Sequence, residues 1–173
     1  MQEGEALYDQ LRQARVWDIQ IPGYIDRDGN CPRFVPFPES VYVVLEGGYL
    51  QLKSLGEEGR MTMHLVSDPI VPTALVDDED EFAMGSYGQT YLADSHSEFR
   101  ITRIRGVRNS DEEFAMQYNC LEFQFENAWH LFVDPGYHFG IRIQGEGSYD
   151  RWLSSDGARL TSTGAHESFL WTP

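Results

Sequence analysis

Two runs of alternating apolar residues, separated by a glycine pair, place the strongest limit on the fold of this chain. Residues 41–55 read VYVVLEGGYLQLKSL, with Gly47-Gly48 between the runs. Glycine accepts the positive φ angles of a two-residue turn, so the segment predicts an antiparallel hairpin in which Glu46 pairs with Tyr49. This register puts five apolar residues on one face: Val41, Val43, Leu45, Leu50 and Leu52. Residues 60–67 predict a third strand of the same meander.

A second segment, 121–135, repeats this pattern 80 residues later. It reads LEFQFENAWHLFVDP, in which alternating apolar residues lead to Glu126, the turn pair Asn127-Ala128 and Trp129. Residues 137–144 alternate as a further strand. The repeat is either an internal duplication or the same local solution reached twice, and we favour the second because hairpins are common.

The remaining segments complete an α+β fold that is mainly an antiparallel β-sheet. Helical spacing of Leu7, Leu11 and Ala14 predicts a short N-terminal helix over 4–15. Residues 16–21, 97–107 and the terminal 169–171 predict strands, whereas 22–40, 77–96 and 106–113 are interpreted as loops and connections. The sum is a single domain, 1–173, with two hairpin or meander units and a short N-terminal helix.

The charge of the chain limits its partners. The formal net charge is −15, and Lys53 is the single lysine. A field of this sign repels phosphate backbones and anionic membranes, so we expect neither nucleic-acid nor membrane binding. It favours solubility and fast capture of a basic protein.

The ends and the cysteines indicate a cytoplasmic protein. The N-terminal residues are acidic and polar, where a secretory signal needs a cation and an apolar run. Cys31 and Cys120 match no zinc or redox spacing, so free thiols are expected, with one disulfide as the alternative.

Five consecutive carboxylates form the densest charge cluster, and we call residues 77–81 the acidic segment. Its members are Asp77, Asp78, Glu79, Asp80 and Glu81. A calcium loop starting at Asp77 would place Phe82 where glycine is needed and Gly88 where glutamate is needed. The segment is therefore interpreted as a surface for a basic partner, with Tyr87 and Tyr91 as aromatic anchors, or as a solvated loop.

Each segment that resembles an enzyme or cofactor motif lacks one residue that the motif requires. Met84 replaces the first glycine of a nucleophile elbow in MGSYG, and Asp150 replaces the third glycine of a phosphate loop in GEGSYD. No cofactor is expected. A weak metal alternative is a site of two histidines and one carboxylate, formed by His130, Asp134 and His138, although turn and packing roles explain these residues better.

Three further expectations concern the second hairpin and the arginines. Two of Glu122, Glu126 and Asp134 could act as a glycosidase pair on a sugar held by Trp129, although strand alternation also explains Glu122 and Glu126. The predicted register puts Trp129, Leu131 and Val133 on a mixed face with Glu122, Gln124 and Glu126, open to a partner subunit. The basic patch is expected to pair with nearby carboxylates such as those at 111–113. It consists of Arg100, Arg103, Arg105 and Arg108.

Size, charge and β content therefore favour a small acidic binding protein over an enzyme. The expected class is an immunity or inhibitor protein, of the kind bacteria make to neutralise a basic toxin. The alternative is a metal-dependent hydrolase, or a carbohydrate-active or carbohydrate-binding protein, that uses residues 129–138.

Overall fold

The computed structural model describes residues 2–76, 81–94, 96–111, 116–161 and 164–173, and it confirms the mainly antiparallel β fold with its N-terminal helix. The strands are β1 (Arg15–Asp26), β2 (Arg33–Pro36), β3 (Ser40–Leu45), β4 (Gly48–Ser54), β5 (Met61–Val66), β6 (Glu81–Ser86), β7 (Phe99–Asn109), β8 (Gln117–Phe125), β9 (His130–Tyr137), β10 (Gly140–Gln144) and β11 (His166–Trp171). The helices are α1 (Gln2–Gln13), α2 (Thr73–Val76), α3 (Gly88–Tyr91), α4 (Ser148–Trp152) and α5 (Ala158–Thr161).

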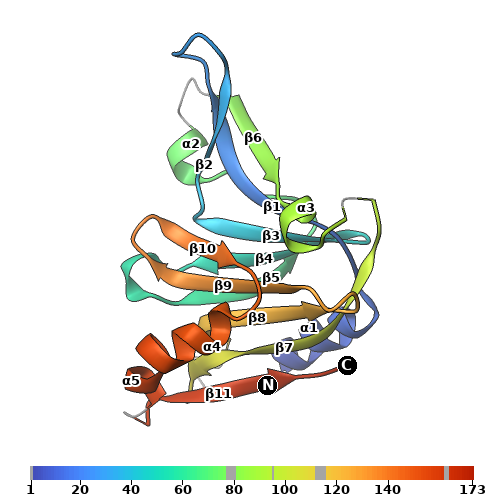
Figure 1. Ribbon diagram of the computed structural model, residues 1–173, viewed down its shortest axis with the longest axis vertical. Helices are drawn as coiled ribbons and strands as arrows, with labels where there is room; N and C mark the ends of the chain where they lie inside the picture. The colour runs from blue at the N-terminus through green and yellow to red at the C-terminus, as the bar shows by residue number, and fades with distance from the viewer. Residues whose placement is uncertain (1, 77–80, 95, 112–115, 162–163) are drawn as a thin grey trace.

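Six antiparallel strands form a sheet that closes on itself. The strands pair in the order β1-β3-β4-β5-β8-β7, and β7 pairs in turn with β1. On the edge of β8 that does not face β7, β5 and β9 pair with different parts of the strand. The interior is filled by the alternating apolar residues of these strands, and α1 adds Leu7 and Leu11 to the same core. Figure 1 shows α1 behind β7 and β8 at one end of this sheet. The predicted core face of the first hairpin, including Val43 and Leu50, is fully buried there.

The first hairpin forms, but its predicted register is wrong by two residues. Leu45 pairs with Gly48 and Val43 with Leu50, so the turn residues are Glu46 and Gly47, and Gly47 takes the positive φ of 92°. A shift of two residues leaves every side chain on its original face because the period of a strand is two. The predicted core face therefore survives the error.

The predicted register of the second hairpin is wrong by one residue, and here the faces change. Phe123 pairs with Leu131, and a three-residue loop ends at Ala128, whose φ is 66°. The three-residue loop with a left-handed final residue is a common hairpin type. Leu131 and Val133 therefore point into the main core rather than onto a mixed face with Glu122 and Gln124. The expected subunit surface is not formed by these residues.

A small three-stranded sheet projects from the closed sheet, and we call it the projecting sheet. It consists of β2, β6 and the outer half of β1, with α2 beside it (Figure 1). Two segments interpreted as loops, 22–40 and 77–96, therefore contain strands. The Phe34 ring packs across this sheet against Gly23 and Gly85. A Cβ atom at either glycine would clash with the ring.

A second, smaller core lies outside the closed sheet, under α4 and α5. It gathers Val107, Cys120, Phe132, Tyr149 and Trp152. Both cysteines are free, Cys120 in this core and Cys31 exposed in the β1–β2 connection. Edge strand β11 pairs with β7 along 166–171, and β7 extends to Asn109, beyond the boundary expected for it.

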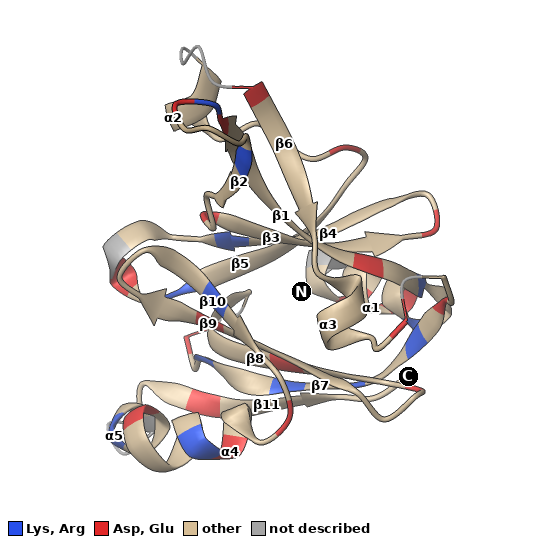
Figure 2. Ribbon diagram, turned by 45° about the horizontal axis from the view of Figure 1, so that its top comes forward, with Lys and Arg blue, Asp and Glu red and all other residues tan. Residues whose placement is uncertain are grey.

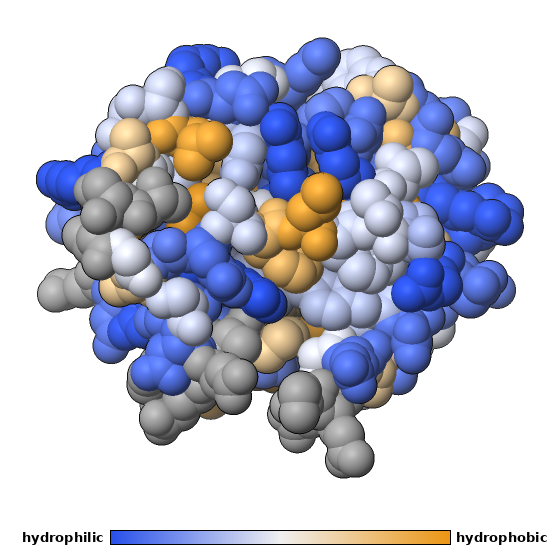
Figure 3. Space-filling view, turned by 90° about the horizontal axis from the view of Figure 1, so that it is seen from below, coloured by the Kyte–Doolittle hydropathy of each residue, from blue (hydrophilic) through white to orange (hydrophobic). Residues whose placement is uncertain are grey.

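The outer surface of this region is polar. Figure 3 shows the molecule from below, with small separate apolar groups on a mainly hydrophilic face. Among the helices that the structure describes, none is both long enough and apolar enough to cross a membrane.

Candidate functional site

The free end of the projecting sheet is the place to which the acidic segment is attached. Residues 77–80 of that segment, Asp77, Asp78, Glu79 and Asp80, lie outside the described residues. Glu81 begins β6, pairs with Ile25 of β1, and its carboxylate accepts a hydrogen bond from Arg27 at 2.6 Å. Figure 2 shows the acidic residue at the free end of β6, remote from the closed sheet.

Both arginines at this end already have carboxylate partners. Arg27 pairs with Glu81, and Arg33 pairs with Asp26 at 2.7 Å. The pKa of Asp26 is lowered by a backbone hydrogen bond from Asp28 and then by Arg33. Segments 24–36 and 73–84 together contain seven acidic and two basic residues, a formal net charge of −5. The two ion pairs are included in this sum, so this part of the chain carries a formal excess of negative charge.

Exposed apolar side chains precede the acidic segment. Ile70 is 56% exposed and Val76 is 63% exposed. The backbone of Ile70 is nevertheless clamped by the buried Tyr42 hydroxyl, which accepts a hydrogen bond from its N–H at 3.0 Å and donates one to its carbonyl at 3.4 Å. Gln51 donates to the same hydroxyl at 2.9 Å. The apolar surface is therefore held in place rather than left to move with a loop.

Tyr87 and Tyr91 lie at the opposite end of β6 from Glu81. Five strand steps separate the two ends by about 17 Å. Both rings pack against the main core, and the Tyr91 hydroxyl donates to the Ile143 carbonyl at 3.0 Å. Burial, with a smaller contribution from Tyr87, raises the pKa of Tyr91. Tyr87 precedes α3 and Tyr91 ends it. The structure therefore does not place these tyrosines beside Glu81 on one surface.

Asp18 explains why β6 turns into α3 at this point. Its Oδ1 accepts hydrogen bonds from Gly88 N at 2.8 Å and from Ser86 Oγ at 2.9 Å. A side chain at position 88 would collide with this carboxylate, so glycine is required there. The sequence segment 84–88 that resembles part of a nucleophile elbow is thus a strand end fixed by Asp18.

His130, Asp134 and His138 have separate partners. His130 Nδ1 lies 3.3 Å from Glu122, whereas Asp134 is buried and accepts a hydrogen bond from Arg142 at 2.7 Å. Residues 130 and 134 are about 13 Å apart along β9, and His138 lies in the β9–β10 turn against Phe139. No group of three or more metal-ligating side chains occurs within the described part of the chain. Trp129 is 45% exposed, so the sugar-binding alternative stays a prediction that depends on this residue.

A buried charge cluster around Glu122 was missed by sequence reasoning. The Glu122 side chain is fully buried, and Arg105 donates to it at 2.6 Å, with Arg103 at 3.8 Å. The pKa of Arg105 is raised: burial acts to lower it, but the hydrogen bond and charge of Glu122 outweigh burial. Alternation of arginines at 103 and 105 opposite Glu122 was the available signal. The basic patch was expected to pair with carboxylates such as those at 111–113: Arg105 pairs with Glu122 and Arg108 with Glu167, while residues 112 and 113 lie outside the described residues.

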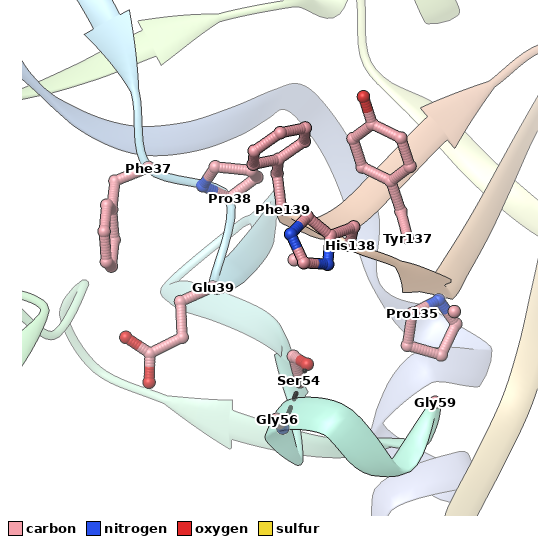
Figure 4. A pocket seen from close by; sticks show the side chains of 12 residues that line it. Phe37, Pro38, Glu39, Ser54, Gly56, Gly59, Pro135, Tyr137, His138 and Phe139 are labelled. Carbon is pink, nitrogen blue, oxygen red and sulfur yellow. Dashed lines mark hydrogen bonds between the residues drawn. The ribbon is translucent and has the colours of Figure 1, made fainter.

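A groove of about 590 Å³ lies between the β9–β10 turn and the segment before β3, and we call it the aromatic groove. One wall carries Tyr137, His138 and Phe139, and the other carries Phe37 and Glu39 (Figure 4). Its base is formed by small or rigid residues: Ser54, Gly56, Gly59, Pro135 and Gly136. Aromatic walls with a few polar groups, here the Glu39 carboxylate and the His138 imidazole, are typical of a ligand-binding pocket.

Comparison of the chain with protein-family models, with curated proteins and with solved structures finds no match. The assignment of a function therefore depends on the geometry of the described surfaces and on the charge of the chain.

Proposed function

We propose that this chain is a small acidic binding protein of the cytosol that captures a basic protein, as a toxin-neutralising immunity or inhibitor protein does. The observation that carries the proposal is the charge arrangement at the free end of the projecting sheet. Arg27 pairs there with Glu81, the last carboxylate of the acidic segment, and Arg33 pairs with Asp26, and with both pairs counted segments 24–36 and 73–84 keep a formal net charge of −5.

Two properties of this end support a protein partner over a small ion. Clustered like charges accelerate encounter with a surface of the opposite sign. Ile70, which precedes the acidic segment in the chain, is exposed and has both backbone groups hydrogen-bonded to Tyr42, so its side chain would add contact area at a low entropic cost of binding. The free thiols of Cys31 and Cys120 are consistent with a reducing compartment.

The test replaces the five carboxylates of the acidic segment with Ser and Asn. The partner, recovered from the native host with tagged protein and then purified, is mixed with each variant by stopped flow over a range of salt concentrations. We expect the association rate constant at low salt to fall by at least about tenfold and its salt dependence to flatten.

A matched control separates this end from the total charge. It neutralises five exposed carboxylates elsewhere on the molecule: Glu5, Asp9, Glu46, Glu146 and Asp156. The two variants have the same net charge. Equal losses of association rate would assign the effect to overall charge, and an unchanged rate in the first variant would refute the proposal for the acidic segment.

A further inference from the structure

The aromatic groove is held open by backbone contacts that join its two walls. Ile141 N donates to the Pro38 carbonyl at 2.7 Å, and Ser54 N donates to the Glu39 carbonyl at 2.9 Å. Gly140 takes a φ of 117°, and a Cβ atom there would collide with Pro38, so the close approach requires glycine. The groove is therefore a built feature of the fold and does not depend on the position of one side chain.

Among the residues that the structure describes, one arrangement occurs three times: an arginine over an aromatic ring and paired with a carboxylate. Arg105 lies 4.2 Å from the ring centre of Tyr149 and pairs with Glu122. Arg108 lies 5.2 Å from the ring of Phe169, and Arg142 lies 5.5 Å from the ring of Tyr137. Their carboxylate partners are Glu167 and Asp134.

The aromatic groove presents two members of this arrangement. Phe37 and Phe139 supply ring faces, and Glu39 supplies a carboxylate on the wall of the groove (Figure 4). Among the described residues, no ion pair or side-chain hydrogen bond involves the Glu39 carboxylate. Phe139 is 69% exposed, which leaves a large apolar ring in water.

We propose that the aromatic groove binds an arginine side chain of the basic partner, which completes the arrangement with Glu39 and the Phe139 ring. The guanidinium is planar, so it stacks on a ring and offers a two-pronged donor to a carboxylate at the same time. A free anion is disfavoured by Glu39 and by the net charge of −15. The identity of the partner as a basic polypeptide rests on the proposed function.

Nuclear magnetic resonance of the full chain tests this directly, with the peptide acetyl-Gly-Gly-Arg-Gly-Gly-amide as the probe. The reporters are backbone amides of four groove glycines: Gly56, Gly59, Gly136 and Gly140. We expect saturable chemical-shift changes of these amides at peptide concentrations on the order of 10 mM, because a few exposed contacts give only weak binding. The same peptide with citrulline, which keeps the shape without the charge, is expected to bind at least about fivefold more weakly.

Two variants assign the contacts. Glu39→Gln and Phe139→Ala are each expected to weaken the arginine peptide by roughly three- to fivefold. The control Leu170→Ala removes another exposed apolar side chain, on β11, and is expected to leave the affinity unchanged. Because Phe139 and Leu170 are both exposed, neither truncation removes core packing.

The outcomes separate this inference from the proposed function. Equal binding of the citrulline peptide, or shifts confined to residues outside the groove, overturns the arginine site. Loss of partner binding on neutralising the acidic segment tests the proposed function alone, since the peptide titration needs no partner. If both hold, Glu39→Gln accelerates dissociation of the partner, whereas the acidic-segment variant slows its association.

Discussion

Tyr42 shows how a single buried hydroxyl controls an exposed surface. Its oxygen joins Gln51 of β4 to both backbone groups of Ile70, which lies far along the chain. The ring is fully buried, so the hydroxyl has no access to water if its partners are lost. Buried polar groups without partners are costly, and this cost keeps the segment before α2 in place.

Tyr42→Phe is expected to lower the free energy of unfolding by about 1–3 kcal/mol, because the Gln51 amide and the Ile70 N–H lose their acceptor. Hydrogen exchange at the Ile70 amide is expected to accelerate beyond the global change. Tyr49→Phe, which alters the neighbouring ring in edge contact with Tyr42, is the matched control. An unchanged exchange rate at Ile70 would contradict the clamp.

At the scale of elements, the projecting sheet differs from the closed sheet in how it is stabilised. The closed sheet encloses a continuous apolar core, whereas β2, β6 and outer β1 have little beneath them. The Phe34 ring of β2 packs over Gly23 of β1 and Gly85 of β6, and so it contacts all three strands. Local opening of this sheet therefore needs less free energy than global unfolding.

Phe34→Ala is expected to accelerate amide exchange in β2 and β6, with little change in β4 or β8. Loss of the ring exposes the backbone around Gly23 and Gly85 without opening a cavity in the main core. Phe139→Ala removes a phenylalanine ring outside the projecting sheet and is the comparison. Uniform acceleration in all strands would show that the projecting sheet opens only with the whole molecule.

At the scale of the whole molecule, four described groups that are buried or partly buried are neutral acids whose pKa values are raised. Burial is the largest cause for the Cys120 thiol and for the hydroxyls of Tyr8, Tyr118 and Tyr149. In the unfolded chain these groups ionise near their ordinary values, about 8.5 for cysteine and about 10 for tyrosine. The folded state retains the protons through that range, so it binds more protons than the unfolded state.

The sign of this linkage predicts instability in alkali. The free energy of unfolding is expected to be constant below about pH 8 with respect to these groups and to fall progressively as the pH rises toward 11. Denaturant titrations at several pH values measure it, and Cys120→Ala should remove the part of the decline that begins near pH 8.5. Stability that rises through this range would contradict the burial of these groups.

Much of the fold could be predicted because helices and strands each have a characteristic spacing of apolar residues in the sequence. Alternation in 41–55 and 121–135 identified the strands, and the spacing of Leu7 and Leu11 identified the helix. The candidate site was predicted less well. The acidic segment is visible in the sequence, but the aromatic groove joins residues 37–39 to 135–140, and no local pattern connects them. Turn geometry was the other weak point, because one extra loop residue at Ala128 reverses the faces of β9.

The antiparallel strands, the apolar faces and the charge of −15 follow from residue type and spacing alone, so they can be predicted without coordinates. Closure of the sheet through β7, the projecting sheet and the Glu122 cluster were decided only by the tertiary structure. These features depend on which strands pair although they lie far apart in the chain. The backbone hydrogen bonds of a strand are the same for any residue, so they do not specify the partner strand. Side-chain packing in three dimensions selects among the possible pairings, and so it also brings Glu39 and Phe139 to the same groove.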